Sequence, residues 1–587
     1  MTRTFYPPSD PHDDDSSHLL SESQSQRRKR TTNVGDVGTT LGQSNSAGCH
    51  YWMPFISVMA ILAICCYGIL YLPSHRTQLH DVADNVESAN ITKTKSFLSV
   101  SPPTVSAVSS SANDSESAGR YITDLLDRQS HTLEQAQSRY MLKTGREPPP
   151  NFNKWFALAQ ENKCLIDNYD RIDRDFEPFY QLAKEHPRRF RQMLDKGQNI
   201  MLKDPRGMTT IRIREGKVEL PDYTGTSFDK DLQQIVQRFS HILPNTEFML
   251  NGRDEPRVAF NVERPNAHAE AILFRDPDPF RIAPVPTAEF FRKQPGCYVS
   301  QLSGGFLGDP IDQVAFFASS SSSDFTVDLW PMLSMAKISP CFSDILFPSV
   351  YYYDSSWWSG KFAYPDNVQW KSKKPIAYWR GMSNGGHIYG ENYRRFSRFR
   401  LVELSRAYPD LIDARLTRFA ETQCTTEDCD RDQIIEEYNI TGDAPREDVY
   451  QYKYALDVDG NSFSGRYLGL LRSGSLVFKS TAFEEYFSDW LRPFVHFIPV
   501  RPDLSDLAAK VAWARTNDQE ARRIQQRGWE FATQVMTDRQ NDCYFARVLL
   551  EWARLANVTN TVVTSNVEGQ NTGSKSRTKF VTASKGA

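Results

Sequence analysis

The segment 452–480 combines glycine, hydroxyl groups and arginine in an order that suits phosphate binding. Its alternating apolar residues predict a strand that ends at Asp459 and Gly460. A short polar loop then leads through Ser464 to Arg466, where a helix is predicted to begin. Unpaired N–H groups converge where a loop enters a helix, and an arginine can grip a phosphate with two donors. The alternative is one more strand–helix unit with a surface arginine.

A second segment, 374–419, repeats this arrangement. A predicted strand runs into the glycine-rich loop that contains Arg380, Gly381 and Ser383. The helix after this loop carries arginines at positions 394, 395, 398 and 400, of which Arg398 and Arg400 are weaker candidates for the ligand. Because open α/β sheets bind ligands at the carboxyl ends of their strands, two such units predict a site for a phosphorylated ligand.

Taken together, these motifs resemble the Cap-ten domain, which defines glycosyltransferase family ninety. The resemblance is carried by Tyr378 to Gly381, Lys453-Tyr454, Asp459-Gly460, Ser464, Arg466, 491–500 and, upstream, 148–155. The family includes fungal capsule-associated proteins, fungal xylosyltransferases and animal protein O-glucosyltransferases. The resemblance implies an α/β fold of the GT-B type, in which two Rossmann-like domains face a cleft, with an inverting mechanism and a UDP-sugar donor.

An inverting transferase needs a base that removes the proton of the acceptor hydroxyl. Asp254 is the candidate, because a strand end, glycine and proline place its carboxylate on a tight loop. In the resembling glucosyltransferases an aspartate in a comparable stretch is the proposed base. Glu255 is the neighbouring competitor, and the alternative is a turn carboxylate that caps its own backbone or pairs with arginine.

We expect the donor to bind at Arg380, Gly381, Ser383, Asp459, Gly460, Ser464 and Arg466, where the two arginines accept the charge that grows on the leaving UDP. Asp457 and Asp459 form an Asp-x-Asp pattern, but a magnesium or manganese ion is not favoured, because no further carboxylate lies nearby in the sequence. We therefore expect no metal ligands and no tightly bound cofactor. His496 is expected to be a core histidine. The aromatic runs 351–353 and 357–358 could stack on a sugar or pack in the core, and His387 could bond a phosphate or lie in solvent.

The composition divides the chain into segments. The predicted organisation is a disordered cytosolic tail (1–50), a transmembrane helix (51–72), a stem with a helix near 120–142 (73–147), an N-terminal Rossmann-like acceptor-side domain (148–350), a C-terminal Rossmann-like nucleotide-sugar domain (351–556) and a disordered tail (557–587). Strands are expected at 247–250 and 314–317. The net charge of −3 gives no indication of nucleic-acid binding.

The uncharged run from Tyr51 to Leu72 is long enough to cross a bilayer, which needs about 20 residues. Basic residues at 27–30 precede it and favour a cytosolic N-terminus. Glycosylation sequons begin at asparagines 90, 113, 439 and 557, all after the run. These features predict a single-pass type II protein of the Golgi or endoplasmic reticulum with a lumenal catalytic region.

Six of the nine cysteines follow the apolar run, which suits disulfides in an oxidising lumen. Cys424 and Cys429 bracket a short polar loop and could pair with each other. Cys164 and Cys543 are expected to be close, because the first and last helices of GT-B chains often return to the same domain. The alternative is a set of buried free thiols.

The sequence therefore predicts a membrane-anchored transferase that moves xylose or glucose from a UDP-sugar to a glycan, polysaccharide or glycoprotein hydroxyl. One alternative is a catalytically silent member of the same fold that binds carbohydrate or acts as a scaffold. Another is a glycoside hydrolase, which needs two carboxylates across a cleft but gives the two glycine–arginine loops no purpose.

Overall fold

The protein is described from a computed structural model. The structure describes residues 122–201, 207–221, 228–260, 262, 326, 329–339, 342–356, 359–360, 368–386, 388, 390–424, 427–440 and 442–574. The predicted tail, the apolar run 51–72, most of the stem and the expected strand at 314–317 lie outside these ranges. Within them, no helix has the length and apolar character needed to span a bilayer.

Among the described residues, the first strand is preceded by a short helical segment at 122–127 and by α4 (Leu133–Thr144), α5 (Phe152–Glu161), α6 (Asp170–Glu185) and α7 (Pro187–Met201). The single helix predicted near 120–142 is interrupted in the structure: residues 122–127 are helical, the chain turns at 128–132, where the Ser130 amide and hydroxyl donate to Asp167, and a new helix, α4, follows. It begins where the Thr132 side chain accepts a hydrogen bond from the Gln135 amide, and it ends at Gly145, whose φ of 65° suits glycine. Its Tyr140 is buried, so this part of the predicted stem belongs to the folded core.

The first sheet is mixed and has the order β2-β1-β3-β4-β6. Its strands are β1 (Met208–Arg214), β2 (Lys217–Glu219), β3 (Thr246–Asn251), β4 (Leu333–Ser334) and β6 (Ile345–Leu346), with α8 (Asp229–Phe239) between β2 and β3. Strand β1 pairs antiparallel with β2 and β3, while β3, β4 and β6 are parallel. The strand expected at 247–250 is confirmed as β3. A small antiparallel pair joins β5 (Ala336–Lys337) to β11 (Glu484–Glu485).

The second sheet is wholly parallel in its pairing, with the order β12-β10-β9-β7-β8. Its strands are β7 (Lys374–Met382), β8 (Ile412–Arg418), β9 (Tyr452–Val458), β10 (Leu476–Ser480) and β12 (Ile498–Val500). Helices α12 (Ser397–Ala407), α13 (Arg431–Tyr438) and α14 (Tyr467–Arg472) connect them. The last five residues of β9 are all buried, as expected for a parallel strand covered on both faces. The predicted α/β class is thus confirmed.

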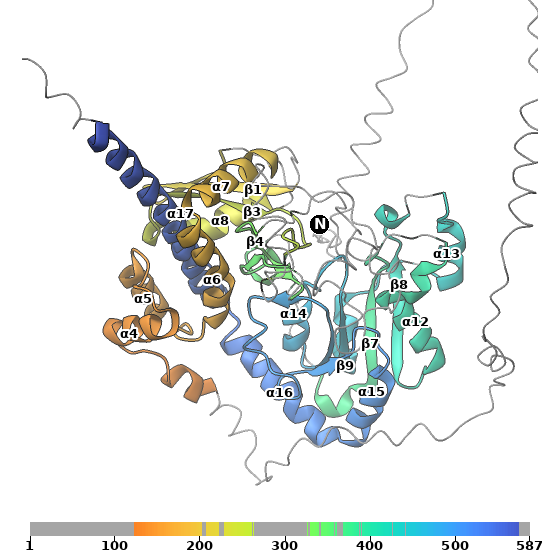
Figure 1. The fold of residues 1–587 in the computed structure, drawn as a ribbon. Helices are drawn as coiled ribbons and strands as arrows, with labels where there is room; N and C mark the ends of the chain where they lie inside the picture. The colour runs from red at the N-terminus through yellow and green to blue at the C-terminus, as the bar shows by residue number, and fades with distance from the viewer. Residues whose placement is uncertain are drawn as a thin grey trace, which may run out of the picture. The chain divides into compact units, whose positions relative to one another are not determined.

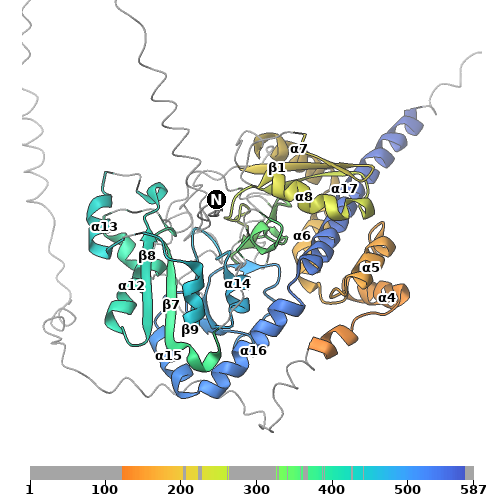
Figure 2. The same ribbon diagram turned by 180° about the vertical axis from the view of Figure 1, so that it is seen from behind.

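The chain ends in α15 (Leu507–Thr516), α16 (Asp518–Gln534) and α17 (Asp538–Ser574). Short 3-10 turns lie at Ser240–Ile242, Val350–Tyr352, Trp370–Ser372, Asn392–Arg395, Glu421–Gln423 and Arg446–Gln451. Helix α17 runs beside α6 and also contacts α5, α7 and α8 (Figures 1 and 2). It therefore packs on the first half of the chain, although the sequence places 538–556 in the second domain. It also continues past Asn557, where the composition predicts that order ends.

The disulfide expected between Cys164 and Cys543 is present, with its Cα atoms 6.5 Å apart. Close by, the Trp155 indole donates to the Cys543 carbonyl at 2.9 Å. This contact and the disulfide are the physical reason that α17 returns to α5. Cys424 and Cys429 also form a disulfide, with Cα atoms 5.4 Å apart. The remaining two of the six cysteines after the apolar run, Cys297 and Cys341, lie outside the described ranges.

Candidate functional site

The order of strands in the second sheet places a topological switch point between β7 and β9. From β7 the chain moves outward to β8, and from β9 it moves in the opposite direction to β10 and β12. Because the two connections leave on opposite sides, the carboxyl ends of β7 and β9 flank a topological switch point, where open α/β sheets bind ligands. Figure 1 shows β7 beside β9. The loop that contains Arg466 follows β9 as predicted, and a glycine-containing loop follows β7, but Arg380 and Gly381, which the sequence predicts in that loop, belong to β7 itself.

The two loops lie against each other. Gly385 has a φ of 126°, and a Cβ added there would lie 3.1 Å from the Gly460 carbonyl oxygen. A Cβ on Gly460 would lie 2.8 Å from the Arg398 guanidinium. Glycine at both positions therefore lets the backbones approach closely.

Arg398 joins the two loops. It is 2% exposed, its Nε donates to the Asp459 carbonyl at 3.0 Å, and its Nη1 donates to the Met382 carbonyl at 3.0 Å and to the Asn384 side chain. Arg398 is thus buried and hydrogen-bonds both loops, and it is not part of a solvated helix face. No sequence pattern indicates this role, because four arginines on one helix usually face water.

The loop of residues 459–466, called here the β9 loop, presents buried polar atoms that lack hydrogen-bond partners among the described residues. These atoms are Asp459 Oδ1, Ser462 Oγ, Ser464 Oγ and Arg466 Nη2. The Arg466 Nη1 donates to the Arg380 carbonyl at 2.6 Å, which fixes the direction of the guanidinium. Buried polar groups are nearly always paired in native proteins, so a cluster of four at a switch point is typical of a ligand site.

Arg380 has a different environment from the one predicted. Its guanidinium forms an ion pair with Asp413 at 2.7 Å and lies 4.4 Å from the centre of the Tyr378 ring. Side chains alternate along a strand, so Trp379 projects from the other face of β7. The Arg466 and Arg398 guanidiniums lie 5.8 and 5.6 Å from that indole. Arg380 contributes to the β9 loop through its main-chain carbonyl, while its side chain braces β8.

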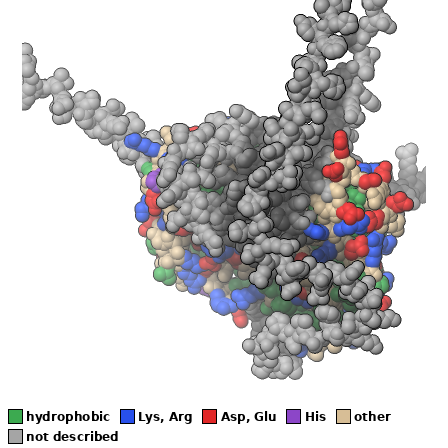
Figure 3. All heavy atoms as spheres, turned by 45° about the vertical axis from the view of Figure 1, so that its right-hand side comes forward, with side chains coloured by type: hydrophobic (Ala, Val, Ile, Leu, Met, Phe, Trp, Pro, Cys, Tyr) green, Lys and Arg blue, Asp and Glu red, His purple; other side chains and the backbone are tan. Residues whose placement is uncertain are grey.

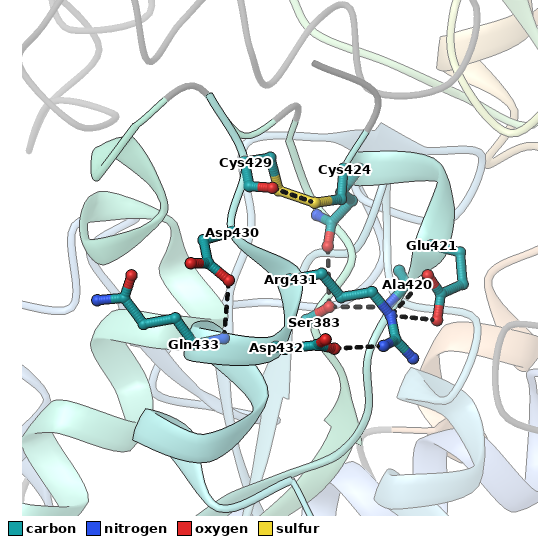
Figure 4. Close-up of a disulfide and its surroundings, with 10 residues drawn as sticks. Ser383, Ala420, Glu421, Cys424, Cys429, Asp430, Arg431, Asp432 and Gln433 are labelled. Carbon is teal, nitrogen blue, oxygen red and sulfur yellow. Dashed lines mark hydrogen bonds and ion pairs between the residues drawn. A yellow bond between two sulfur atoms is a disulfide. The ribbon is translucent and has the colours of Figure 1, made fainter. Parts of the chain in front are cut away.

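Ser383 is fully buried and faces the short turn after β8. Its hydroxyl donates to Gln423 at 2.9 Å and accepts from the Ala420 amide at 2.9 Å, as Figure 4 shows for Ser383 and Ala420. The Cys424–Cys429 disulfide follows directly. Ser383 therefore anchors the glycine-rich loop to a disulfide-closed turn. Gly381 lies beside it at the end of β7, where an added Cβ would lie 2.7 Å from the Trp379 ring.

Asp459 is 4% exposed, and its Oδ2 accepts from the Ala482 amide at 2.7 Å. Burial raises the pKa of Asp459 to about 7, although nearby Lys479 opposes this change. Asp457 is fully buried and pairs with Lys479 at 2.9 Å. The two aspartates of the Asp-x-Asp pattern therefore bind groups of the protein itself, the Ala482 amide and Lys479, and hold the end of β9 in place. Among the described residues, no group of three or more histidine, cysteine, aspartate or glutamate side chains is arranged to hold a metal ion.

Asp254 lies in the turn after β3, at the carboxyl end of that strand in the first sheet, and is half-buried. The Asn251 side chain accepts from the Arg253 amide at 3.1 Å and donates to the Glu255 carbonyl at 2.6 Å, so it fixes the turn. Burial raises the pKa of the competitor Glu255. Both carboxylates therefore sit on a rigid turn.

The structure describes some of the aromatic and histidine residues singled out in the sequence, and these are buried. Tyr351, Tyr352 and Tyr353 are buried in the core, while Trp357, Trp358 and His387 lie outside the described ranges. His496 is the expected core histidine: it is 1% exposed, its Nδ1 accepts from the Arg492 amide at 2.8 Å, and burial lowers its pKa to about 4. On the face shown in Figure 3, basic and acidic side chains lie among one another on the described surface.

Comparison with known proteins places the second half of the chain in context. Residues 361–579 match the family Glycosyl transferase family 90. The chain is 32% identical over 185 residues to Protein O-glucosyltransferase 3 of Rattus norvegicus, covering 31% of this chain and 33% of that protein. It is 32% identical over 187 residues to Protein O-glucosyltransferase 2 of Danio rerio, covering 32% and 34%. The matched region thus spans about a third of these relatives' length.

Among solved structures, the sucrose-phosphate synthase of Thermosynechococcus elongatus is similar with a TM-score of 0.23 and 14% identity, covering 37% of this chain and 53% of that one. That similarity is too low to bear on the fold.

Proposed function

We propose that this chain, which matches glycosyl transferase family 90 over residues 361–579, is a transferase that moves a sugar from a UDP-sugar to a hydroxyl group with inversion. The observation that carries the proposal is the cluster of buried polar atoms in the β9 loop, which lack hydrogen-bond partners among the described residues. The cluster lies at the switch point between β7 and β9. A nucleoside diphosphate has the phosphate oxygens and hydroxyl groups that these atoms would bind.

In this proposal Arg466 and the hydroxyls of Ser462 and Ser464 hold the diphosphate, and the charge on Arg466 stabilises the leaving UDP. Arg398 keeps the two loops together without contacting the sugar. Asp459 has a carboxylate with a pKa of about 7, which suits a hydrogen bond to a sugar hydroxyl in either protonation state. The donor is proposed to bind without a metal ion, because Lys479 already supplies the cation next to Asp457.

Asp254 is proposed as the base that takes the proton from the acceptor hydroxyl. Support comes from the rigid turn at the end of β3 and from the resemblance to the glucosyltransferases. The proposal requires the first and second sheets to belong to two Rossmann-like domains of a GT-B arrangement with a cleft between them. It also requires this turn to face the β9 loop.

The donor sugar is proposed to be glucose or xylose. Glucose is supported by relatives that are named protein O-glucosyltransferases. Xylose is supported by the resemblance to a family that includes fungal xylosyltransferases. The acceptor is proposed to be a glycan, polysaccharide or glycoprotein. Type II insertion in a Golgi or endoplasmic-reticulum membrane through residues 51–72 is supported by the two disulfides, which form in an oxidising lumen.

The test is to purify the full-length chain in detergent, measure UDP binding by calorimetry, and incubate it with UDP-glucose, UDP-xylose and other UDP-sugars while UDP release is detected. We expect UDP to bind and one donor to be consumed in preference. Absence of UDP binding would remove the proposed donor site. Binding of UDP with no release from any donor, over a panel of acceptors, would instead favour the catalytically silent alternative.

A further inference from the structure

Tyr352, at the end of the turn Val350–Tyr352, connects the first half of the chain to the β9 loop. It is 1% exposed, and its hydroxyl lies within hydrogen-bonding distance of two acceptors. One is the Glu485 carboxylate, and the other is the Ser464 carbonyl at 3.3 Å. A tyrosine hydroxyl has a single proton, so it can donate fully to only one of them at a time.

The β9 loop packs directly on this turn. A Cβ added to Gly465 would lie 2.7 Å from the Tyr351 ring, so loop and turn are in close contact. The Gly360 amide donates to the Tyr351 carbonyl at 2.7 Å, and a Cβ on Gly360 would overlap the Gly465 carbonyl. Because the loop and the turn are closely packed, loss of the hydrogen bond between Tyr352 and Ser464 is expected to shift the β9 loop.

Glu485 lies in a buried cluster with more acids than bases. Lys479 is the ammonium at its centre, 2.9 Å from Asp457 and 3.6 Å from Glu485. Burial would lower the pKa of Lys479, but the carboxylates around it raise that pKa, so it stays charged. The titratable groups facing Glu485 are Tyr352, Asp457 of β9, Asp459 of the β9 loop, Tyr467 of α14, Lys479 of β10 and the adjacent Tyr486.

One ammonium cannot balance three buried carboxylates, and an unbalanced buried charge is costly. The shorter contact of Lys479 is with Asp457, which leaves Glu485 as a group that holds a proton. Burial raises the pKa of Glu485 to about 8, and repulsion from Asp457 and Asp459 adds to this effect.

We propose that Tyr352 and Glu485 are positioning residues for the β9 loop: protonated Glu485 donates to the Tyr352 oxygen, and Tyr352 then donates its own proton to the Ser464 carbonyl. When Glu485 is ionised, Tyr352 turns its proton to the carboxylate, and the Ser464 carbonyl loses its donor. The idea rests on the proposed function in one respect, that the β9 loop holds the nucleotide. Nucleotide binding is then expected to be strongest while Glu485 carries its proton and to weaken as the pH rises above about 8.

The first experiment measures UDP affinity of the full-length chain by calorimetry between pH 7.0 and 9.5, for the wild type, Glu485→Gln, Tyr352→Phe and Tyr353→Phe. The glutamine amide donates to Tyr352 at every pH, so we expect Glu485→Gln to abolish the alkaline weakening seen in the wild type. Tyr352→Phe should weaken binding at pH 7 about fivefold, the usual worth of one neutral hydrogen bond. Tyr353→Phe is the matched control, because its buried hydroxyl has no hydrogen-bond partner among the described residues.

Equal pH profiles for the wild type and Glu485→Gln, or equal affinities for the two tyrosine variants, would overturn the proposal. A second measurement does not depend on UDP: hydrogen exchange at pH 7 of a peptide that covers 461–466, without ligand. We expect faster exchange in Tyr352→Phe than in the wild type or Tyr353→Phe, and equal exchange would refute the positioning role. If the wild type fails to bind UDP, the proposed function fails, while the exchange experiment still decides whether Tyr352 positions the loop. Thermal unfolding checks that each variant folds. If Tyr352→Phe does not fold, the exchange of the wild type and Glu485→Gln is compared at pH 9.5, where we expect faster exchange in the wild type, and equal exchange would refute the positioning role.

Discussion

Arg380 and Arg466 show how far single residues can be assigned from sequence. The sequence predicts that both follow strands of one sheet and lie beside glycine, and therefore the same role for the two, but β7 extends to Met382 and contains Arg380. The difference arises from the strand partner: β8 brings Asp413 beside β7, and this aspartate pairs with Arg380. No sequence pattern reports that neighbour, because it depends on which strands are adjacent. The guanidinium of Arg466, in contrast, has one nitrogen with no partner among the described residues.

Arg466→Ala should therefore weaken UDP binding much more than it destabilises the fold. Loss of a hydrogen bond to a charged group costs about 1.5–3 kcal/mol, which predicts an increase in Kd of roughly tenfold or more. Calorimetry with UDP measures this, and Arg431→Ala is the control, because Arg431 forms an exposed pair with Glu421. A folded Arg466→Ala protein with unchanged UDP affinity would make Arg466 a structural residue.

Asp254→Asn should leave UDP binding intact and reduce sugar transfer by about a hundredfold or more, the usual contribution of a positioned base. Asparagine keeps the size and hydrogen-bonding capacity of the side chain but cannot take the acceptor's proton. Turnover with saturating UDP-sugar measures the loss. Glu255→Gln is the matched comparison, and normal turnover in Asp254→Asn with a large loss in Glu255→Gln would transfer the role to Glu255.

At the scale of elements, the sequence predicts strands and loops better than their order. Alternating apolar residues locate β3 and β9, and glycine marks the loops after β7 and β9. The switch point itself depends on β7 lying between β8 and β9, which is long-range pairing that local patterns do not encode. The same limit applies to Arg398, whose three acceptors come from two loops that meet only in the folded sheet.

The turn closed by Cys424 and Cys429 should influence the donor site through the glycine-rich loop. The turn holds Ser383 through Gln423, and the Asp428 carbonyl accepts from the Gly390 amide at 3.0 Å. Replacing both cysteines with serine should loosen this support and weaken UDP binding about threefold, within the usual cost of ordering one or two interface groups. Calorimetry at pH 7 measures the change. Unchanged affinity would show that the loop is held without the disulfide.

At the scale of the whole chain, the two sheets draw on successive parts of the sequence, 208–346 and 374–500, but the last helix crosses back to the first part. Composition alone gives no reason for this return, since α17 is separated from α5 by most of the fold. The expected proximity of Cys164 and Cys543 came from family resemblance and is confirmed by their disulfide. A buried pair extends the same contact: Arg547 and Glu551 of α17 bond to each other, and Tyr140 of α4 donates to Glu551 at 2.9 Å.

The two disulfides should therefore differ in what they contribute to stability. A disulfide stabilises mainly by restricting the unfolded chain, and the restriction grows with the length of the closed loop. The sequence separation is 379 residues for Cys164–Cys543 and 5 for Cys424–Cys429. On the chain-entropy account, replacing the first pair with serine should lower the free energy of unfolding by up to about 5 kcal/mol, and replacing the second by roughly 2 kcal/mol. Thermal unfolding of the two double variants, measured side by side in oxidising buffer, gives the comparison. A similar loss in both would mean that local packing around each bridge, and not loop closure, determines its contribution, and that α17 is held on the first half by its buried contacts alone.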